Sequence, residues 1–402
     1  MFTGMTKHIF LASLLGFAAA ASGQTMAGTW DATLQINGVA TPFRLEITGT
    51  DAKLTGTLFN GAEKYSSTSG SFANGTLTLG WDYYASTLKA TLKDGVLEGQ
   101  YAGTRRMTGP FPFRAQHAAK VEAAKSSAPP IAGVWWIPTN SGKGEKAWRF
   151  VVQQSGNDLT VAILRVDGDT GSIVGGWRGD KFVVSKFDGA RAFLMEIKPS
   201  KEGTLDILQD GKTKYTAYRP EMAKAMKLPE PTDPTAHTSV KDPKEPFRFQ
   251  FPDLTGKMVS NTDARFRNKV VVIEITGSWC PNCHDEAPFL EEMYRTYKDR
   301  GLEVVSLSFE EAEQLKDPTR LKAFVKQYKL EFPVLLGGDT ETAAEHLPQL
   351  VNWNTWPATL FVDRKGLVRS THAGFPSTGS GDLFVAAKEE FKVQVGRLLA
   401  EK

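Results

Sequence analysis

The sequence predicts a multidomain protein in which two all-β modules precede an α/β domain. In the first half, short alternating runs are separated by Asn-Gly and Asp-Gly pairs, which are strong signals for β-hairpins. A segment rich in proline follows at residues 228–246. Beyond it, apolar runs alternate with amphipathic segments, a pattern typical of strands that alternate with helices.

The first 23 residues have the order of a secretory signal peptide. Lys7 and His8 precede an apolar stretch from Ile9 to Ala20, and small residues follow as far as Gly23. This order is typical of export, and the stretch is shorter than the ~20 residues of a spanning helix. We expect an exported, periplasmic protein in which residues 1–23 are cleaved off or retained as an anchor.

Two stretches of the first half resemble one another and predict two diverged copies of one module, at residues 24–119 and 128–220. Ala27-Gly28-Thr29-Trp30 recurs 105 positions later as Ala132-Gly133-Val134-Trp135. Each copy has roughly eight short strands, which form a small barrel or a sandwich. Their tryptophans are expected in the cores, and these are Trp30, Trp81, Trp135 and Trp177.

The charge and cysteine counts narrow the class of function. Lys and Arg number 48 against 45 Asp and Glu, a net charge of +3, whereas nucleic-acid binding needs a concentrated basic face. We therefore expect no nucleic-acid partner. The chain has two cysteines, Cys280 and Cys283. Disulfide-stapled secreted proteins scatter several pairs, so this close pair predicts redox chemistry or ligand binding.

The last domain, expected at residues 247–402, begins after the proline-rich segment, which we interpret as a semi-rigid spacer. Val270 to Ile275 is a continuous apolar run, typical of a buried central strand. A helix is expected from near Cys280 to Gly301. Further strands are expected at 304–307, 332–336, 359–362 and 366–373, with helices after Asp317-Pro318 and at the end of the chain.

The run Trp279-Cys280-Pro281-Asn282-Cys283 follows the predicted central strand and resembles the active site of thioredoxins. With Glu286 and Pro288 it reads Cys-x-x-Cys-x-x-Glu-x-Pro, which is similar to the TlpA/ResA branch of exported thiol–disulfide oxidoreductases. Trp356-Pro357-Ala358-Thr359 resembles the segment around the cis-proline of that family. The resemblance covers about residues 246–402 and implies a thioredoxin fold and a reductase of disulfides in exported proteins.

Cys280 is the expected nucleophile because the N-terminus of a helix stabilises a thiolate. Cys283, one turn deeper, is expected to resolve the mixed disulfide, so the two form the redox-active disulfide. Glu274, six residues before Cys280, stands where many thioredoxins have a buried acid. We expect its carboxyl to accept the proton of Cys283, which makes Cys280, Cys283 and Glu274 the predicted catalytic residues.

The expected substrate-binding residues are Trp279, Trp356 and Pro357, and the resemblance implies that Pro357 is cis. Trp356 is bulkier than the small or β-branched residue usual there in the family, which bears on substrate preference. Glu286 is an influence on the site or an exposed helix residue. His346 and His372 are interpreted as surface residues without a role, and neither a metal nor another cofactor is expected.

The expected partners are disulfide-containing or dithiol proteins and an upstream electron donor at the membrane. Other functions stay open. The same pair serves a disulfide oxidase or isomerase, or holds copper(I) in a metallochaperone. Cys280 to His284 also spells the Cys-x-x-Cys-His signature of c-type haem attachment. A peroxidase is disfavoured because Gly277 and Ile273 replace the residues that peroxiredoxins need.

Overall fold

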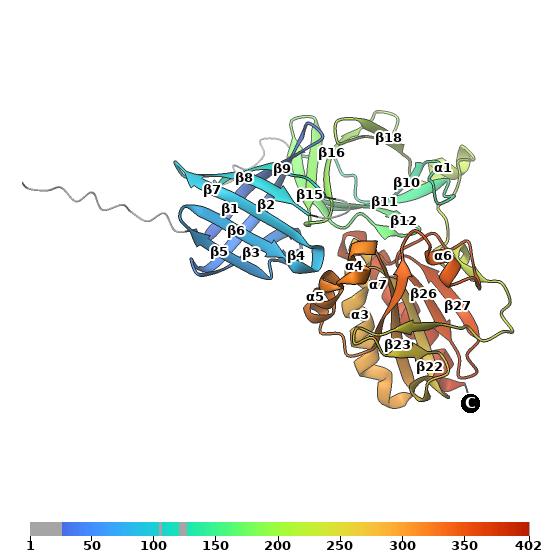
Figure 1. The fold of residues 1–402 in the computed structure, drawn as a ribbon. Coiled ribbons are helices and arrows are strands. Elements are labelled where there is room, and N and C mark those ends of the chain that lie inside the picture. Colours follow the sequence, from blue (N-terminus) through green and yellow to red (C-terminus); the bar gives the residue numbers. More distant parts are fainter. Residues whose placement is uncertain (1–25, 104–106, 120–126, 402) are drawn as a thin grey trace, which may run out of the picture.

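The computed structural model describes residues 26–103, 107–119 and 127–401. Two β-sheets lie side by side, and an α/β domain packs beneath them (Figure 1). The predicted signal peptide lies outside the described residues. Within the described ranges, no helix is long and apolar enough to cross a membrane.

The first sheet is antiparallel and barrel-like. Its strand order is β4-β3-β2-β1-β9-β8-β7-β6-β5, and β3 also contacts β5, which brings the two ends of the sheet together. Trp30 and Trp81 are buried inside it, as predicted. Its elements are β1 (Gly28–Ile36), β2 (Val39–Thr50), β3 (Lys53–Asn60), β4 (Glu63–Ser66), β5 (Ser69–Ala73), β6 (Thr76–Trp81), η1 (Asp82–Tyr84), β7 (Ser86–Lys93), β8 (Val96–Ala102) and β9 (Phe111–His117).

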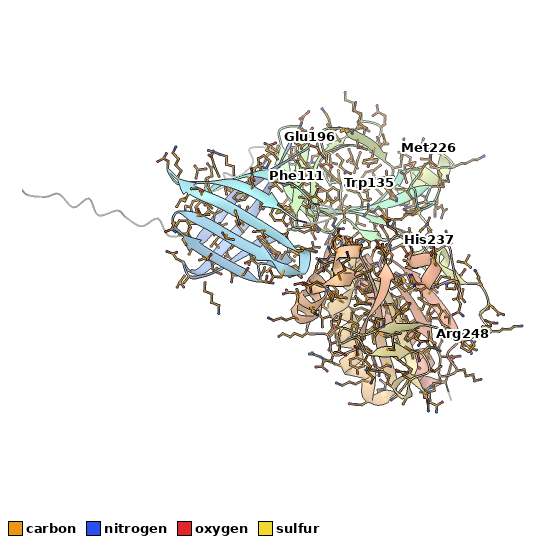
Figure 2. All side chains as sticks on the ribbon, viewed as in Figure 1. Phe111, Trp135, Glu196, Met226, His237 and Arg248 are labelled. Carbon is orange, nitrogen blue, oxygen red and sulfur yellow. The ribbon has the colours of Figure 1, made fainter. Side chains whose placement is uncertain are left out.

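The second sheet is also antiparallel and barrel-like. Its order is β10-β11-β12-β14-β15-β16-β17-β18, with β13 added beside β12. A bridge between Trp136 and Tyr218 joins β10 to the residue after β18 and closes the ring. Figure 2 shows Trp135 among the side chains of this ring. The strands are β10 (Gly133–Pro138), β11 (Ala147–Ser155), β12 (Asp158–Arg165), β13 (Gly168–Asp169), β14 (Ile173–Arg178), β15 (Lys181–Phe187), β16 (Ala192–Pro199), β17 (Leu205–Gln209) and β18 (Thr213–Ala217).

The two sheets begin with equivalent hairpins. Trp30 pairs with Leu45 in the first sheet, and Trp135 pairs with Phe150 at the corresponding place in the second. Each indole N–H donates to the carbonyl oxygen four residues earlier, at 3.1 Å in the first sheet and 2.9 Å in the second. The equivalent residues of the two sheets are 105 positions apart, which is the spacing of the repeat in the sequence.

The proline-rich segment packs on the α/β domain, which differs from the predicted spacer. After α1 (Pro220–Ala225) it forms α2 (Pro234–His237) and β19 (Ser239–Val240), and β19 pairs with β25 (Leu350–Val351). His237 is buried, and Figure 2 places it near the junction with the α/β domain. The residues between the prolines make these contacts. A high density of prolines is therefore not enough to predict a spacer without contacts to the next domain.

The α/β domain has a five-stranded sheet with the order β24-β23-β22-β26-β27. The first three strands are parallel, whereas β26 and β27 run antiparallel to their neighbours. Its elements are β20 (Gln250–Pro252), β21 (Met258–Ser260), η2 (Ala264–Phe266), β22 (Val270–Thr276), α3 (Pro281–Tyr297), η3 (Lys298–Arg300), β23 (Leu302–Glu310), α4 (Ala312–Lys316), α5 (Thr319–Tyr328), β24 (Val334–Asp339), α6 (Ala343–His346), β26 (Ala358–Val362), β27 (Val368–Ala373), η4 (Thr378–Ser380) and α7 (Asp382–Ala400).

Both faces of this sheet are buried, which explains the continuous apolar run in β22. Val270 and Val272 pack with residues of α3, α5 and α7 on one face. Val271 and Ile273 pack on the other face, against the segment that contains β20 and β21. Side chains therefore cover both faces of the central strand β22 as far as the turn that leads into α3.

Candidate active site

The paired cysteines lie where the central strand β22 passes into helix α3. Cys280 is the N-cap residue and Pro281 is the first residue of the helix, a position that suits proline because its fixed φ is helical. The backbone N–H of Cys283 donates to the carbonyl oxygen of Cys280 at 3.1 Å. Cys280 and Cys283 are not joined by a disulfide bond. The first turn thus places one sulfur at the helix start and the other one turn deeper.

Cys280 is itself buried. Its residue surface is 3% exposed, because Trp279 and Trp356 pack against it. The Cys280 thiol donates to the carbonyl oxygen of Trp356 at 3.4 Å. Burial also raises the pKa of the Cys283 thiol well above its usual range, and the neighbouring Cys280 and Glu274 add to that effect.

Two buried carboxyl groups lie beneath the cysteines. Glu274 is fully buried, as predicted, and burial raises its pKa to about 7 although Ser306 donates a hydrogen bond to it. Glu286 is also fully buried, which excludes the exposed alternative. Burial, and then the charge of Glu274, raise the pKa of Glu286 well above its usual range. Near neutral pH this pair therefore holds a proton close to Cys283.

Pro357 directly follows Trp356, whose carbonyl oxygen accepts the hydrogen bond from Cys280. The Trp356–Pro357 peptide bond is cis, as predicted, and the carbonyl oxygen of Pro357 accepts a hydrogen bond from the N–H of Gly374 at 2.8 Å. The ring of Trp356 lies 5.5 Å from that of Trp279 and 5.0 Å from that of Trp353. The three predicted substrate-binding residues, Trp279, Trp356 and Pro357, are thus gathered near Cys280.

The loop before Cys280 is held by a buried ion pair that the sequence did not indicate. Ser278 donates to Glu310 from its backbone N–H at 2.8 Å and from its hydroxyl at 2.7 Å. Arg320 pairs with Glu310 at 2.7 Å and also donates to the Ser278 hydroxyl at 2.8 Å. Buried charges that are paired in this way hold a loop in one position. The acid at the end of β23 and the arginine in α5 carry no local motif.

His284, which follows the second cysteine, is engaged at both ring nitrogens. Its Nε2–H donates to the carbonyl oxygen of Ser278 at 2.8 Å, and its Nδ1 accepts from the hydroxyl of Tyr328 at 2.9 Å. Burial lowers the pKa of His284 to about 3. The imidazole is therefore neutral and held in the fold, which weighs against its use as an axial haem ligand.

The predicted surface position of His372 is wrong. It is 4% exposed because it lies on β27 beneath α7, where its ring is 5.0 Å from that of Phe391. Its Nδ1–H donates to the carbonyl oxygen of Gly374 at 2.9 Å, and burial lowers its pKa to about 4. His346 is exposed, as predicted.

The second β-sheet contacts Asn282, one of the two residues between the cysteines, and sequence reasoning missed this contact. The side-chain amide of Asn282 donates to the carbonyl oxygen of Asp167 at 2.5 Å. Its amide oxygen accepts from Arg191 at 2.9 Å. Gly168 also forms a bridge with Phe375, close to the end of β27. The redox motif therefore lies at a domain boundary. Among the described residues, no group of three or more His, Cys, Asp or Glu is arranged to hold a metal ion.

Part of this chain is similar to known proteins. The AhpC/TSA family matches residues 244–371. The thiol-disulfide oxidoreductase ResA of Bacillus thuringiensis is 33% identical over 127 residues, which are 31% of this chain and 65% of ResA. The thioredoxin-like protein YneN of Bacillus subtilis is 31% identical over 31% of this chain and 68% of YneN. A solved thioredoxin-family thiol:disulfide interchange protein from Chlorobium tepidum is 20% identical over 40% of this chain and 100% of its own, with a TM-score of 0.29.

The sheet order, the cysteine pair at the start of α3 and the cis-proline beside it define a thioredoxin-fold domain with a dithiol site. Through this domain the chain belongs to the thioredoxin-like proteins of the TlpA/ResA type. It spans 65% of the length of the ResA relative.

Proposed function

We propose that this protein is a thiol–disulfide oxidoreductase that reduces disulfides in exported proteins. The observation that carries the proposal is the stacking of three groups at the end of β22: Cys280 at the helix start, Cys283 one turn deeper, and the carboxyl pair of Glu274 and Glu286 beneath. A nucleophile, a resolving thiol and a proton acceptor are the parts that disulfide exchange needs.

The proposed reaction has two exchange steps. The Cys280 thiolate attacks one sulfur of the substrate disulfide, and the other substrate sulfur leaves as a thiolate that takes up a proton. Cys283 then loses its proton to Glu274 and attacks the sulfur of Cys280, which releases the second substrate thiol. Two electrons pass to the substrate, and the protein is left with a Cys280–Cys283 disulfide. A dithiol donor must reduce this disulfide before the next turnover.

Access to Cys280 is part of the proposal. With 3% of its surface exposed, Cys280 meets a protein disulfide only after Trp356 or the second β-sheet moves aside. The aromatic group formed by Trp279, Trp353 and Trp356 then offers apolar contacts to the segment that carries the disulfide. The bulk of Trp356 beside the cis-proline favours substrates with small residues next to their cysteine.

The reducing direction is supported by the buried acid. A proton acceptor under Cys283 speeds resolution of the mixed disulfide, which is the step that completes a reduction. The order of charge, apolar residues and small residues in positions 1–23 supports export to the periplasm. There, the proposed partners are disulfide-containing proteins as substrates and a membrane-associated dithiol donor.

A redox titration of the cysteine pair against glutathione tests this proposal. We expect a reduction potential close to that of reducing relatives, about −270 mV, rather than the about −120 mV of strong oxidants. The reduced protein should also reduce insulin, with Cys280→Ser as the inactive control. A potential near the oxidising end would assign the protein to disulfide formation. A pair that does not oxidise at all would contradict the redox function itself.

A further inference from the structure

Asn282, the second of the two residues between the cysteines, is held from outside its own domain. Asn282 is 4% exposed, and both ends of its side-chain amide are used by the second β-sheet. The amide N–H donates to the carbonyl oxygen of Asp167 at 2.5 Å, and the amide oxygen accepts from Arg191 at 2.9 Å. Asn282 is the second residue of α3. Its side chain therefore ties the first turn of the redox helix to that sheet.

Arg191 is itself fixed. It is 6% exposed, its Nε donates to Asp188 at 3.2 Å, and the Nη1 that reaches Asn282 also donates to the carbonyl oxygen of Asp169 at 2.9 Å. A planar guanidinium with several fixed donors loses little freedom when it makes one more hydrogen bond. Arg191 is thus a rigid support for Asn282.

Beside this contact, the backbone of Gly168 lies so close to the α/β domain that no side chain fits at this position. Gly168 has φ +100°, and a Cβ there would lie 2.2 Å from the carbonyl oxygen of Phe375 and 2.4 Å from the side-chain nitrogen of Asn282. Glycine is therefore required for the second sheet to reach the first turn of α3. A contact of this tightness transmits small displacements of the sheet to the helix.

Several other titratable groups surround this turn. On the β-sheets they are Glu63, Asp169, Lys186 and Asp188, and on α3 they are His284 and Asp285. Burial, followed by the charges of Glu63 and Asp169, raises the pKa of Asp285 well above its usual range. Without Arg191, less positive charge would balance the negative charges of Asp169 and Asp188 near the start of α3.

We propose that Arg191 is a positioning residue of the redox site: through Asn282 it fixes the first turn of α3 and sets the reactivity of Cys280. The inference rests on the proposed function. The N–H groups of this turn and the helix dipole stabilise a thiolate at the N-cap. Arg191 keeps the turn in place and adds positive charge to a region otherwise rich in carboxylates. The second β-sheet is thereby a working part of the redox site.

The test compares the intact chain with its Arg191→Met variant. The reduced proteins are alkylated with iodoacetamide from pH 5 to 10, and mass spectrometry follows the Cys280 peptide. The midpoint of the rate profile reports the pKa of Cys280, whereas the plateau at high pH reports access. We expect the midpoint to rise by about one pH unit, which is about a tenfold lower thiolate fraction near neutral pH. The matched control is Arg178→Met, an exposed arginine on β14 of the same sheet.

A role confined to covering the site gives a different result. If Arg191→Met raises the plateau and leaves the midpoint in place, the arginine only shields Cys280 and the proposal is overturned. Arg191→Lys keeps the positive charge but lacks the planar guanidinium with its several donors, and it should raise the midpoint by less than Arg191→Met. If Arg191→Met fails to fold, the midpoint of Arg191→Lys tests the proposal instead. In an Asn282→Ala background, Arg191→Met should cause a much smaller shift, because the link is already broken.

The proposed function fails in a separate way. If wild-type protein reduces no disulfide, the oxidoreductase assignment falls, and the alkylation midpoints still report whether Arg191 acts on Cys280. If wild-type protein exchanges disulfides and the midpoint is the same in both proteins, only the role of Arg191 is lost.

Discussion

Asn60 of the first β-sheet and Phe187 of the second exchange two hydrogen bonds across their boundary. The Asn60 amide donates to the carbonyl oxygen of Phe187 at 2.9 Å, and the N–H of Phe187 donates to the Asn60 amide oxygen at 3.1 Å. Asn60 is 1% exposed. The Asn60 side chain thus bonds the backbone N–H and C=O of Phe187 as a neighbouring strand would, and it joins the two sheets at a place from which water is excluded.

Asn60→Ala should weaken this boundary. The substitution leaves a buried N–H and a buried C=O of Phe187 without partners, which costs about 1–3 kcal/mol. Urea unfolding of the full chain should show a lower midpoint, and limited proteolysis should cut between the sheets sooner. The exposed Asn140→Ala, in the loop after β10, is the control. Equal stability of the two variants would contradict the importance of the contact.

Cys283→Ser should trap a mixed disulfide with substrate, whereas Cys280→Ser should trap none. The reason is that Cys280 stands at the start of α3 and Cys283 is fully buried one turn deeper. Non-reducing gels after incubation with a disulfide-bonded protein check this. Trapping by Cys280→Ser would reverse the two roles.

Glu274→Gln should slow the resolution of the mixed disulfide. A general base contributes typically about 10²–10⁴-fold, and glutamine keeps the shape of the side chain without its basicity. Because the pKa of Glu274 is raised to about 7, the wild-type rate should rise with pH through that value. The variant should lack this rise. The measurement is rapid quenching of the mixed disulfide from pH 6 to 9, and identical profiles would make Glu274 a bystander.

The same carboxyl should make wild-type stability depend on pH. A carboxyl whose pKa is raised on folding, here to about 7, binds its proton more tightly in the folded state. Its stabilising contribution is complete below the unfolded pKa and is lost as pH rises toward 7. Wild-type protein should therefore lose up to about 3 kcal/mol between pH 4.5 and 8 from this group. Glu274→Gln should remove that part of the slope in thermal melts, and an unchanged slope would refute it.

The fragment 246–402 should fold without the β-sheets, because both faces of its sheet have their own apolar cores. In the fragment, Asn282 loses its two contacts to the second sheet. We therefore expect faster alkylation of Cys280 at high pH than in the full chain. Circular dichroism and the alkylation rate check the two parts. An unfolded fragment would show that the domain boundary lies elsewhere.

Local patterns predicted the parts of the site that lie close together in the sequence. Cys280 and Cys283 form one motif, and Glu274 could be placed in the core because Ile273 and Ile275 flank it in a continuous apolar run. The hairpin turn at Asn74 and Gly75, where both residues have positive φ, was also predicted, since Asn-Gly tolerates that conformation.

Contacts between distant segments could not be predicted in the same way. Arg191 and Asn282 are 91 positions apart, and nothing in either local sequence selects the other. The burial of Cys280 depends on Trp356, which is 76 positions away. Likewise His372 is covered by Phe391 of α7, although its own strand reads as an exposed edge. Burial at a domain boundary arises from packing that a single sequence does not express.

The two hydrogen bonds that hold the Asn282 side chain have a consequence for the order in which the domains fold. Asp167 and Arg191 both precede Asn282 in the chain, and domains generally fold from the N-terminus as they emerge. In this order, the surface that receives the first turn of α3 forms before the α/β domain folds. When the last domain folds, the first turn of α3 packs at once against this surface, which limits the encounter of the two thiols with other thiols during folding.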